Sequence, residues 1–100
     1  MNAISKVSQI TIQDLADYIR VSELTSDEVN TLNTLLNVAK NYICQYTGRT
    51  SEELDNYSDF VIVVFVLVQD MWDNRALYVD NTNVNKVVES ILGLHSVNLL

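Results

Sequence analysis

The chain contains no proline and only two glycines, Gly48 and Gly93, in 100 residues. Sharp turns and bulges depend on the fixed φ of proline or on the positive φ that glycine adopts without a steric penalty. A chain with so few of these residues can make few sharp reversals, which excludes an all-β sandwich. The sequence therefore favours an all-α fold built from a few long helices.

Length and charge narrow the classes of function. A chain of 100 residues that is 48% hydrophobic supports one core, and we expect a single domain covering residues 1–100. Because one small core leaves no room for a deep enclosed catalytic cavity, we expect that the protein is not an enzyme. Thirteen acidic residues oppose six basic ones, for a net charge of -7. The basic residues form no cluster, which excludes a protein that grips DNA tightly.

The sequence has no candidate membrane or export segment. Its longest apolar run, from Phe60 to Val68, is far shorter than the roughly 20 residues that a bilayer-spanning helix needs. Residues 1–10 lack the apolar run of a signal peptide, and the single Cys44 cannot form an internal disulfide. We therefore expect a soluble protein that is made in the cytoplasm.

Caps and hydrophobic spacing predict two helices in the first half of the chain. The first begins after Thr11, which forms a capping box with Asp14. The second begins at Ser26 or Asp27 and ends at Gly48, which serves as a left-handed cap. Its inward positions recur every three or four residues: Val29, Leu32, Leu35, Leu36, Ala39, Ile43 and Tyr46.

The third predicted helix runs from Phe60 to about Tyr78, after a cap at Ser58 and Asp59. Its first half is rich in β-branched residues that also suit a buried strand, but the pattern continues past Val68 without a breaker, which favours one long helix. Apolar residues cover both of its sides, so it either lies at the centre of its own domain or is shared with a partner. We expect a small bundle of about four helices with this long central apolar third helix.

The fourth predicted helix is short. Asn83 is its expected cap and Gly93 its expected end. The apolar residues expected to point inward are Val84, Val87, Val88, Ile91 and Leu92. The segment from His95 to Leu100 follows, and we expect its apolar residues to dock on another surface.

Residues that carry chemistry are sparse. His95 and Cys44 each occur once and lie on different elements, which argues against a zinc site or a Cys–His dyad. We expect Cys44 to be a half-buried structural thiol and His95 to be a surface residue of the tail. Asp70 and Asp73 could share a cation, but a solvated helix face or a pairing with Arg75 explains them better. No catalytic, metal or cofactor-binding site is predicted, and no cofactor.

Aromatic and arginine side chains, most of them near the ends of the predicted helices, are candidate interface anchors, because such residues often dominate binding at protein interfaces. The candidates are Tyr46, Arg49, Phe65, Trp72, Arg75 and, in the apolar tail, Leu99. Alternatively, the aromatic residues complete the core while Arg49 and Arg75 pair with carboxylates nearby.

Three segments in order, residues 10–20, 39–49 and 71–75, resemble the small head-tail connector (adaptor) proteins of tailed phages and prophages. The family pattern is a capped first helix, a second helix that ends in tyrosine-threonine-glycine-arginine, as in residues 46–49, and a third that ends in an aromatic residue, an acid, asparagine and arginine. Trp72 and Asp73 stand where the family commonly has tyrosine and glutamate, and Asn74 and Arg75 match it.

The resemblance implies an α-helical structural protein that catalyses nothing and assembles as a homo-oligomeric ring beneath the portal protein, in the neck of the virion. The genome would pass through the ring without specific binding, and a tail or stopper protein would dock onto it. The protein would be made in the cytoplasm of the bacterial host. Acidic charge in such a conduit lets DNA slide, because no phosphate counterions are exchanged for fixed Lys or Arg.

Two other classes remain open. One is a small helical regulatory or antitoxin-like module that forms a twofold dimer through the third helix and the tail and binds a polypeptide. The other is a metal-dependent enzyme that uses Glu52, Asp70 and Asp73, which would require at least three converging oxygen ligands.

Overall fold

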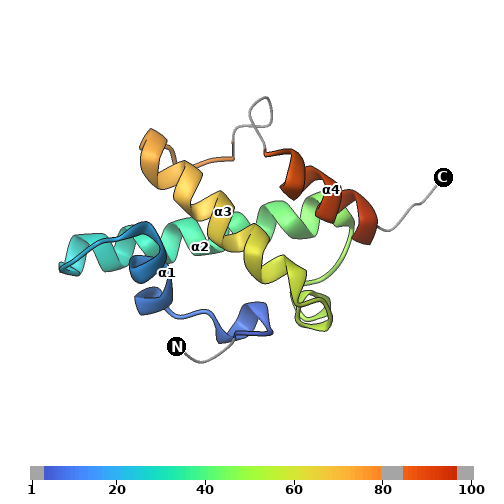
Figure 1. Cartoon of the computed structure of the whole chain (residues 1–100), viewed down its shortest axis with the longest axis horizontal. Helices are drawn as coiled ribbons and strands as arrows, with labels where there is room; N and C mark the ends of the chain where they lie inside the picture. Colours follow the sequence, from blue (N-terminus) through green and yellow to red (C-terminus); the bar gives the residue numbers. More distant parts are fainter. Residues whose placement is uncertain (1–3, 80–84, 97–100) are drawn as a thin grey trace.

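The computed structural model describes residues 4–79 and 85–96. Over these ranges it contains four α-helices, two short 3-10 turns and no strand, which confirms the all-α expectation (Figure 1). The elements in chain order are η1 (Val7–Gln9), α1 (Ile12–Ile19), α2 (Ser26–Thr47), η2 (Glu53–Asn56), α3 (Asp59–Asn74) and α4 (Lys86–His95).

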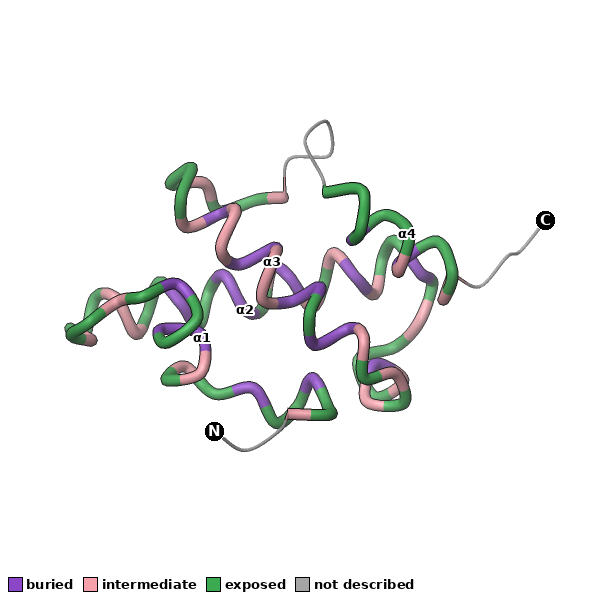
Figure 2. Tube along the Cα trace, viewed as in Figure 1, coloured by how far each residue is buried: buried purple, intermediate pink, exposed green. Residues whose placement is uncertain are grey.

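The two longer helices cross, and the shorter elements pack around the crossing (Figure 1). α3 packs against α1, α2 and α4, and α2 also contacts both α1 and α4. The buried residues of all four helices join with Val7, Ile10 and Leu54 in one hydrophobic core (Figure 2). The arrangement leaves α1 and α4 on different parts of α2.

Capping boxes begin the first two helices. Thr11 Oγ1 accepts from the Asp14 N–H at 3.1 Å while Asp14 Oδ2 accepts from the Thr11 N–H at 2.9 Å, as the sequence predicts. α2 starts at Ser26, the first of the two predicted positions. Its cap is Thr25, which forms the same reciprocal pair with Glu28. Both boxes provide acceptors for amides that have no partner within the helix.

Left-handed residues end the first three helices. Gly48 has φ of 74° and closes α2 as predicted. Arg20 at the end of α1 and Arg75 at the end of α3 adopt the same conformation, with φ of 65° and 53°. The expectation that the third helix reaches about Tyr78 is therefore wrong, because Arg75 stops it after Asn74.

The third helix is shorter than expected. α3 has 16 residues, whereas α2 has 22. Its apolar half is buried on most sides, through Phe60, Val61, Val63, Val64, Leu67 and Val68. Ile62 is the exception at 55% exposed, and Phe65 and Val66 are partly covered. Ser58, the predicted cap, has a helical backbone conformation and no capping side-chain hydrogen bond. Most of the apolar surface of α3 is thus used inside the chain's own core.

The fourth helix begins and ends later than expected. Its cap is Asn85, whose Oδ1 accepts from the Val87 N–H at 2.7 Å. It continues through Gly93 to His95, so the prediction that Gly93 ends it is wrong. Val88 and Leu92 are fully buried, but Val87 is 59% exposed rather than inward. The predicted roles of Asn83, Val84 and the apolar tail residues, Leu99 included, lie outside the described residues.

Candidate protein-interaction site

Within residues 4–79 and 85–96, no three His, Cys, Asp or Glu side chains come close enough to hold a metal ion. None of the helices in those ranges is long and apolar enough to cross a bilayer. Asp70 and Asp73 each accept a hydrogen bond within α3, Asp70 Oδ1 from Asn74 Nδ2 at 3.2 Å and Asp73 Oδ1 from Gln69 Nε2 at 2.9 Å. Both carboxylates are thus engaged in hydrogen bonds along the surface of one helix.

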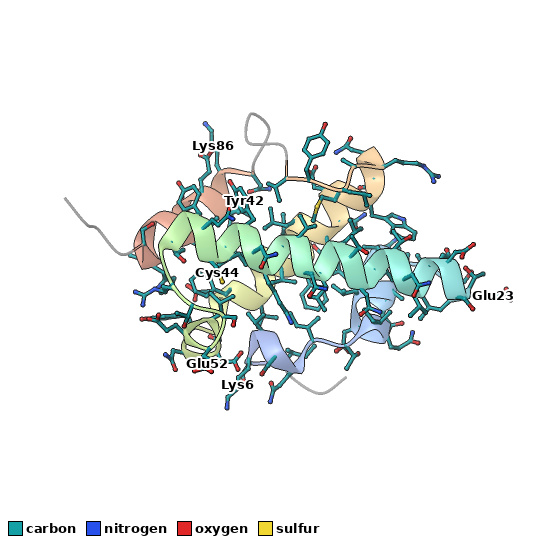
Figure 3. The ribbon with its side chains drawn as sticks, turned by 180° about the vertical axis from the view of Figure 1, so that it is seen from behind. Lys6, Glu23, Tyr42, Cys44, Glu52 and Lys86 are labelled. Carbon is teal, nitrogen blue, oxygen red and sulfur yellow. The ribbon has the colours of Figure 1, made fainter. Side chains whose placement is uncertain are left out.

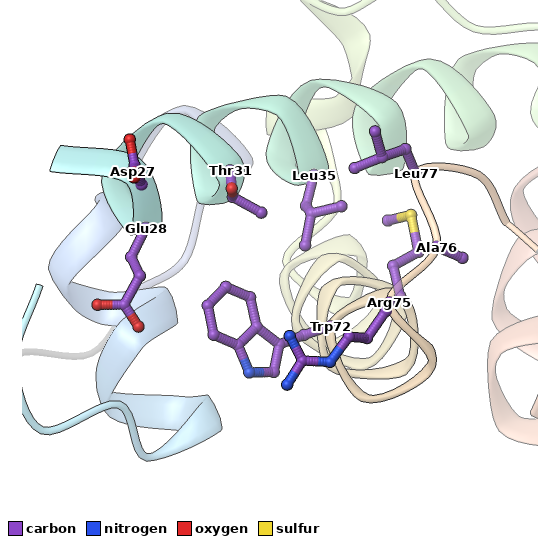
Figure 4. A pocket seen from close by; sticks show the side chains of 9 residues that line it. Asp27, Glu28, Thr31, Leu35, Trp72, Arg75, Ala76 and Leu77 are labelled. Atoms are coloured by element: carbon purple, nitrogen blue, oxygen red, sulfur yellow. The ribbon is translucent and has the colours of Figure 1, made fainter. Parts of the chain in front are cut away.

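An open groove lies between the first turns of α2 and the end of α3 (Figure 4). Its volume is about 470 Å³. α2 contributes Asp27, Glu28, Thr31 and Leu35, α3 contributes Met71 and Trp72, and the chain after α3 contributes Arg75, Ala76 and Leu77. The carboxylates stand at one end of the groove, whereas Leu35 and Leu77 stand toward the other, with Trp72 between (Figure 4).

The left-handed turn at Arg75 builds one wall of this groove. The Arg75 N–H donates to the Trp72 carbonyl at 3.3 Å and the Ala76 N–H donates to the Met71 carbonyl at 3.0 Å, a pattern that reverses the chain at a helix end. The reversal brings Leu77 across from α2, where it remains 61% exposed. Among the described residues, no carboxylate oxygen lies within 4.0 Å of Arg75, so the expected pairing is not seen there.

A second cluster joins the end of α4 to the first turn of α3 and to the segment that precedes it. His95 Nε2 lies 2.8 Å from Asp59 Oδ2, and the imidazole packs against the rings of Tyr57 and Phe60, with centroids 4.3 and 5.0 Å away. The His95 side chain is only 16% exposed. The expectation of a surface residue is therefore wrong, because aromatic neighbours and a carboxylate on α3 cover the ring.

Arg49 completes this cluster, which we call the α4 clasp: Arg49, Tyr57, Asp59, Phe60 and His95. Arg49 Nε donates to the His95 carbonyl at 2.6 Å, and its guanidinium carbon lies 4.7 Å from the centroid of the Tyr57 ring. An ion pair to Glu53 at 3.3 Å holds the guanidinium from the other side. The expected pairing of Arg49 with a nearby carboxylate is thus seen with Glu53, and its contact with α4 goes to a backbone carbonyl.

Two ionisable groups near this cluster have shifted pKa values. The Thr50 N–H donates to Glu53 Oε1 at 3.1 Å and is the main reason that the pKa of Glu53 lies below its usual value, with Arg49 adding to the effect. Burial, followed by the charge of Glu53, raises the pKa of the Cys44 thiol. Cys44 is half-buried, as predicted, and a raised pKa keeps the less reactive thiol form.

The other predicted anchors are distributed over the surface. Tyr46 is 45% exposed at the end of α2, beside Tyr42 at a centroid distance of 6.0 Å. Its carbonyl accepts from Ser96 Oγ at 3.2 Å. Phe65 is half-buried and packs against Tyr18 of α1 at 5.0 Å. Of the anchors in the described ranges, the structure brings Trp72 and Arg75 together at the groove and places Tyr46 and Arg49 near α4.

Sequence reasoning missed an exposed apolar surface on α4. Val87 and Leu94 are 59% and 76% exposed, and Ile91, which is partly buried, lies between them on the same side of the helix. We call these three residues the α4 stripe. The spacing 87, 91, 94 is visible in the sequence, but the prediction places both Val87 and Val88 in the core, although adjacent helical residues point about 100° apart.

No family model matches this chain, and no curated protein sequence and no solved structure is significantly similar to it.

Proposed function

We propose that the protein is a head-tail connector of a tailed phage or prophage, a structural protein that forms a ring between the portal protein and a tail or stopper protein in the neck of the virion. The observation that carries the proposal is that one protomer has two different exposed apolar surfaces, the groove and the α4 stripe. A cyclic ring joins each copy to the next through two unlike surfaces, whereas a twofold dimer uses one surface twice.

The positions of the two surfaces support this proposal. The groove uses the first turns of α2, from Asp27 to Leu35, whereas α4 packs near its last turns, beside Tyr42 and Tyr46. In Figure 3, Lys86 of α4 lies near Tyr42, and Glu23 marks the opposite end of the molecule. Surfaces at opposite ends of a protomer allow copies to associate head to tail.

The helix ends agree with the resemblance seen in the sequence. The three matching segments contribute the Thr11–Asp14 capping box, the Gly48 cap and the left-handed Arg75 that shapes the groove. We also propose that α3 acts as the central apolar helix of the protomer, since it packs against the three other helices. The net charge of -7 suits a ring through which DNA passes without being held.

Electron microscopy of the protein mixed with the portal protein encoded beside its gene tests the proposal. We expect added ring density on the face of the portal that receives the tail. Portal particles without added density, at a large excess of the protein, would contradict the connector function. A mobility-shift assay with duplex DNA provides the companion measurement, and retention at physiological salt would contradict an inert conduit.

The regulatory or antitoxin-like module is the second candidate, and the groove is the feature that favours it, because an apolar groove with carboxylates at one end can receive a helix. That class was expected to dimerise through the third helix. The burial of most of α3 gives this dimer little surface, with Ile62 the main exposed apolar residue of its first half. A closed dimer of fixed mass in light scattering would favour this candidate over a ring.

A further inference from the structure

We infer that the groove of one copy receives the α4 stripe of a second copy. The inference rests on the proposed function in that it takes the partner to be the chain itself. It goes further by assigning the contact surfaces, their relative direction and the charge pair that sets this direction.

The two surfaces match in length. The α2 wall of the groove extends from Asp27 to Leu35, and eight steps at the helical rise of 1.5 Å cover about 12 Å. The α4 stripe extends from Val87 to Leu94, and seven such steps cover about 10 Å. One side of α4 can therefore lie along the groove without extending beyond it.

The two surfaces also match in chemistry. Trp72, Ala76 and the exposed Leu77 give the groove an apolar lining to which branched side chains can pack, above a floor formed by the buried Leu35 and Met71. A half-buried tryptophan is the kind of residue that contributes strongly when a partner covers it. Burying Val87 and Leu94 there would remove the two most exposed apolar side chains of α4 from water.

Charge sets the direction of the contact. Asp27 and Glu28 stand at one end of the groove, and Lys86 is the first residue of α4, next to the stripe and exposed. With Lys86 beside the two carboxylates, Leu94 lies toward Leu35 and Leu77, so α4 of the second copy runs in the same direction as α2. The opposite direction would place the ammonium group among apolar side chains and leave the carboxylates without a partner.

The stripe cannot reach the groove of its own copy. Val88 and Leu92 fix α4 in the core, and the His95–Asp59 and Arg49–His95 contacts of the α4 clasp hold its end. On α2, α4 faces Tyr42 and Tyr46 through Glu89, about two to three turns beyond the groove. The contact is therefore between copies, and its repetition gives a ring when the rotation closes.

One such contact is small. A stable pairwise interface covers about 800 Å² on each partner, more than a three-residue stripe with a flanking lysine supplies. We expect two free copies to associate weakly, at high concentration. A ring strengthens this contact because each copy is held on two sides.

The first test replaces the stripe. Val87→Asp combined with Leu94→Asp should weaken self-association at least tenfold in sedimentation velocity, because two carboxylates would have to be buried. The control carries Ile62→Asp, which puts a single carboxylate at a 55% exposed apolar residue of α3 outside the groove. Circular dichroism checks that both variants remain folded. An equal loss in the control, or no loss in the stripe variant, would overturn the inference.

The second test reverses the charges. Asp27→Lys changes the net charge from -7 to -5, which reduces general repulsion between copies and by itself favours association. We nevertheless expect roughly tenfold weaker association, because this change sets two ammonium groups side by side. Combining it with Lys86→Glu should restore most of the affinity. Glu23→Lys, which makes the same charge change outside the groove, should not weaken association.

Three further outcomes would overturn the assignment. The first is the absence of any self-association at millimolar concentration. The second is a double charge reversal that does not restore the affinity between copies. The third is loss of association when residues 97–100 are deleted, which would assign the groove to the terminal segment instead. If the stripe and charge variants still add ring density to the portal, this interface is wrong and the connector function stands. If association depends on these charges but no ring density forms on the portal, the interface stands and the connector function is wrong.

Discussion

His95 Nε2 lies 2.8 Å from Asp59 Oδ2, and this contact joins the last residue of α4 to the first residue of α3. The Asp59 carboxylate lies at a helix N-terminus, where the helix dipole favours a negative charge. Tyr57 and Phe60 cover the imidazole. The contact therefore fixes the end of α4 against the start of α3.

Replacing His95 with alanine should destabilise the protein by about 1–3 kcal/mol, because the change removes a partly buried hydrogen bond and aromatic contacts. Urea unfolding measures the loss. Hydrogen exchange should locate it in α4, whose end would be freed. Ser90→Ala, at an exposed position of the same helix, is the control. If His95→Ala were no more destabilising than this control, the clasp would have no structural role.

The two arginines should respond in opposite directions. Arg49→Ala removes the 2.6 Å hydrogen bond to the His95 carbonyl, and we expect a loss of about 1.5–3 kcal/mol, the usual range for a bond from a charged donor. Arg75→Gly relieves a non-glycine residue at φ of 53°, and we expect a gain of about 1 kcal/mol. Thermal unfolding of both variants checks the signs. Destabilisation by Arg75→Gly would show that its side chain supports the fold.

The two glycines form a similar pair. Gly48→Ala should cost about 1 kcal/mol, because a backbone φ of 74° is strained for a residue that carries a Cβ. Gly93 lies inside α4, and a Cβ there would meet nothing within 4 Å, so Gly93→Ala should stabilise the helix by about 0.5–1 kcal/mol. Chemical denaturation of the two variants compares them directly. The same sign in both would contradict the helix ends described above.

Asp55 should contribute a pH-dependent part of the stability. Its Oδ1 accepts from the Ser8 N–H at 3.0 Å, and this bond is the main reason that the pKa of Asp55 lies below its usual value. Because the folded-state pKa is the lower one, the unfolded chain takes up the proton first as the pH falls. The stabilisation is complete above about pH 5 and is lost as the pH falls through the folded-state pKa.

Asp55→Asn measures this contribution, because the amide keeps an acceptor oxygen and removes the charge. The difference in unfolding free energy between the natural protein and this variant should be largest near pH 7 and should shrink below about pH 4. Asp17→Asn, a change at an exposed carboxylate of α1, controls for general charge effects. A difference that did not change with pH would contradict the role of the charge.

The helix ends that the sequence predicts correctly are those with local signals. The Thr11–Asp14 box and the Gly48 cap each depend on residues no more than four positions apart. Arg75 gives no such signal, since a left-handed arginine is uncommon and nothing in its neighbours requires it. At α4, Asn83 and Asn85 are equally good caps by type, so the start could not be fixed from local pattern alone.

The candidate site depends on contacts across the chain, which local pattern does not contain. Trp72 and Arg75 were identified as anchors by residue type, but the groove exists only because the crossing of α2 and α3 places Leu35 beside Trp72. His95 was assigned to the surface because its cover, Asp59, lies 36 positions earlier. The α4 stripe is hard to predict for a different reason, because apolar residues lie on more than one side of α4 and their pattern alone does not show which side meets the core.

The small share of α4 in the core has a kinetic consequence. α4 contributes Val88 and Leu92 to the buried core, whereas α3 alone contributes seven residues, so most of the apolar burial of the folding transition state can form without α4. We therefore expect α4 to join after the folding barrier, so that loss of the clasp accelerates unfolding and leaves the refolding rate nearly unchanged. Stopped-flow measurements on His95→Ala would separate the two rates. The clasp would then determine how long α4 stays docked, and not how quickly the rest of the chain folds.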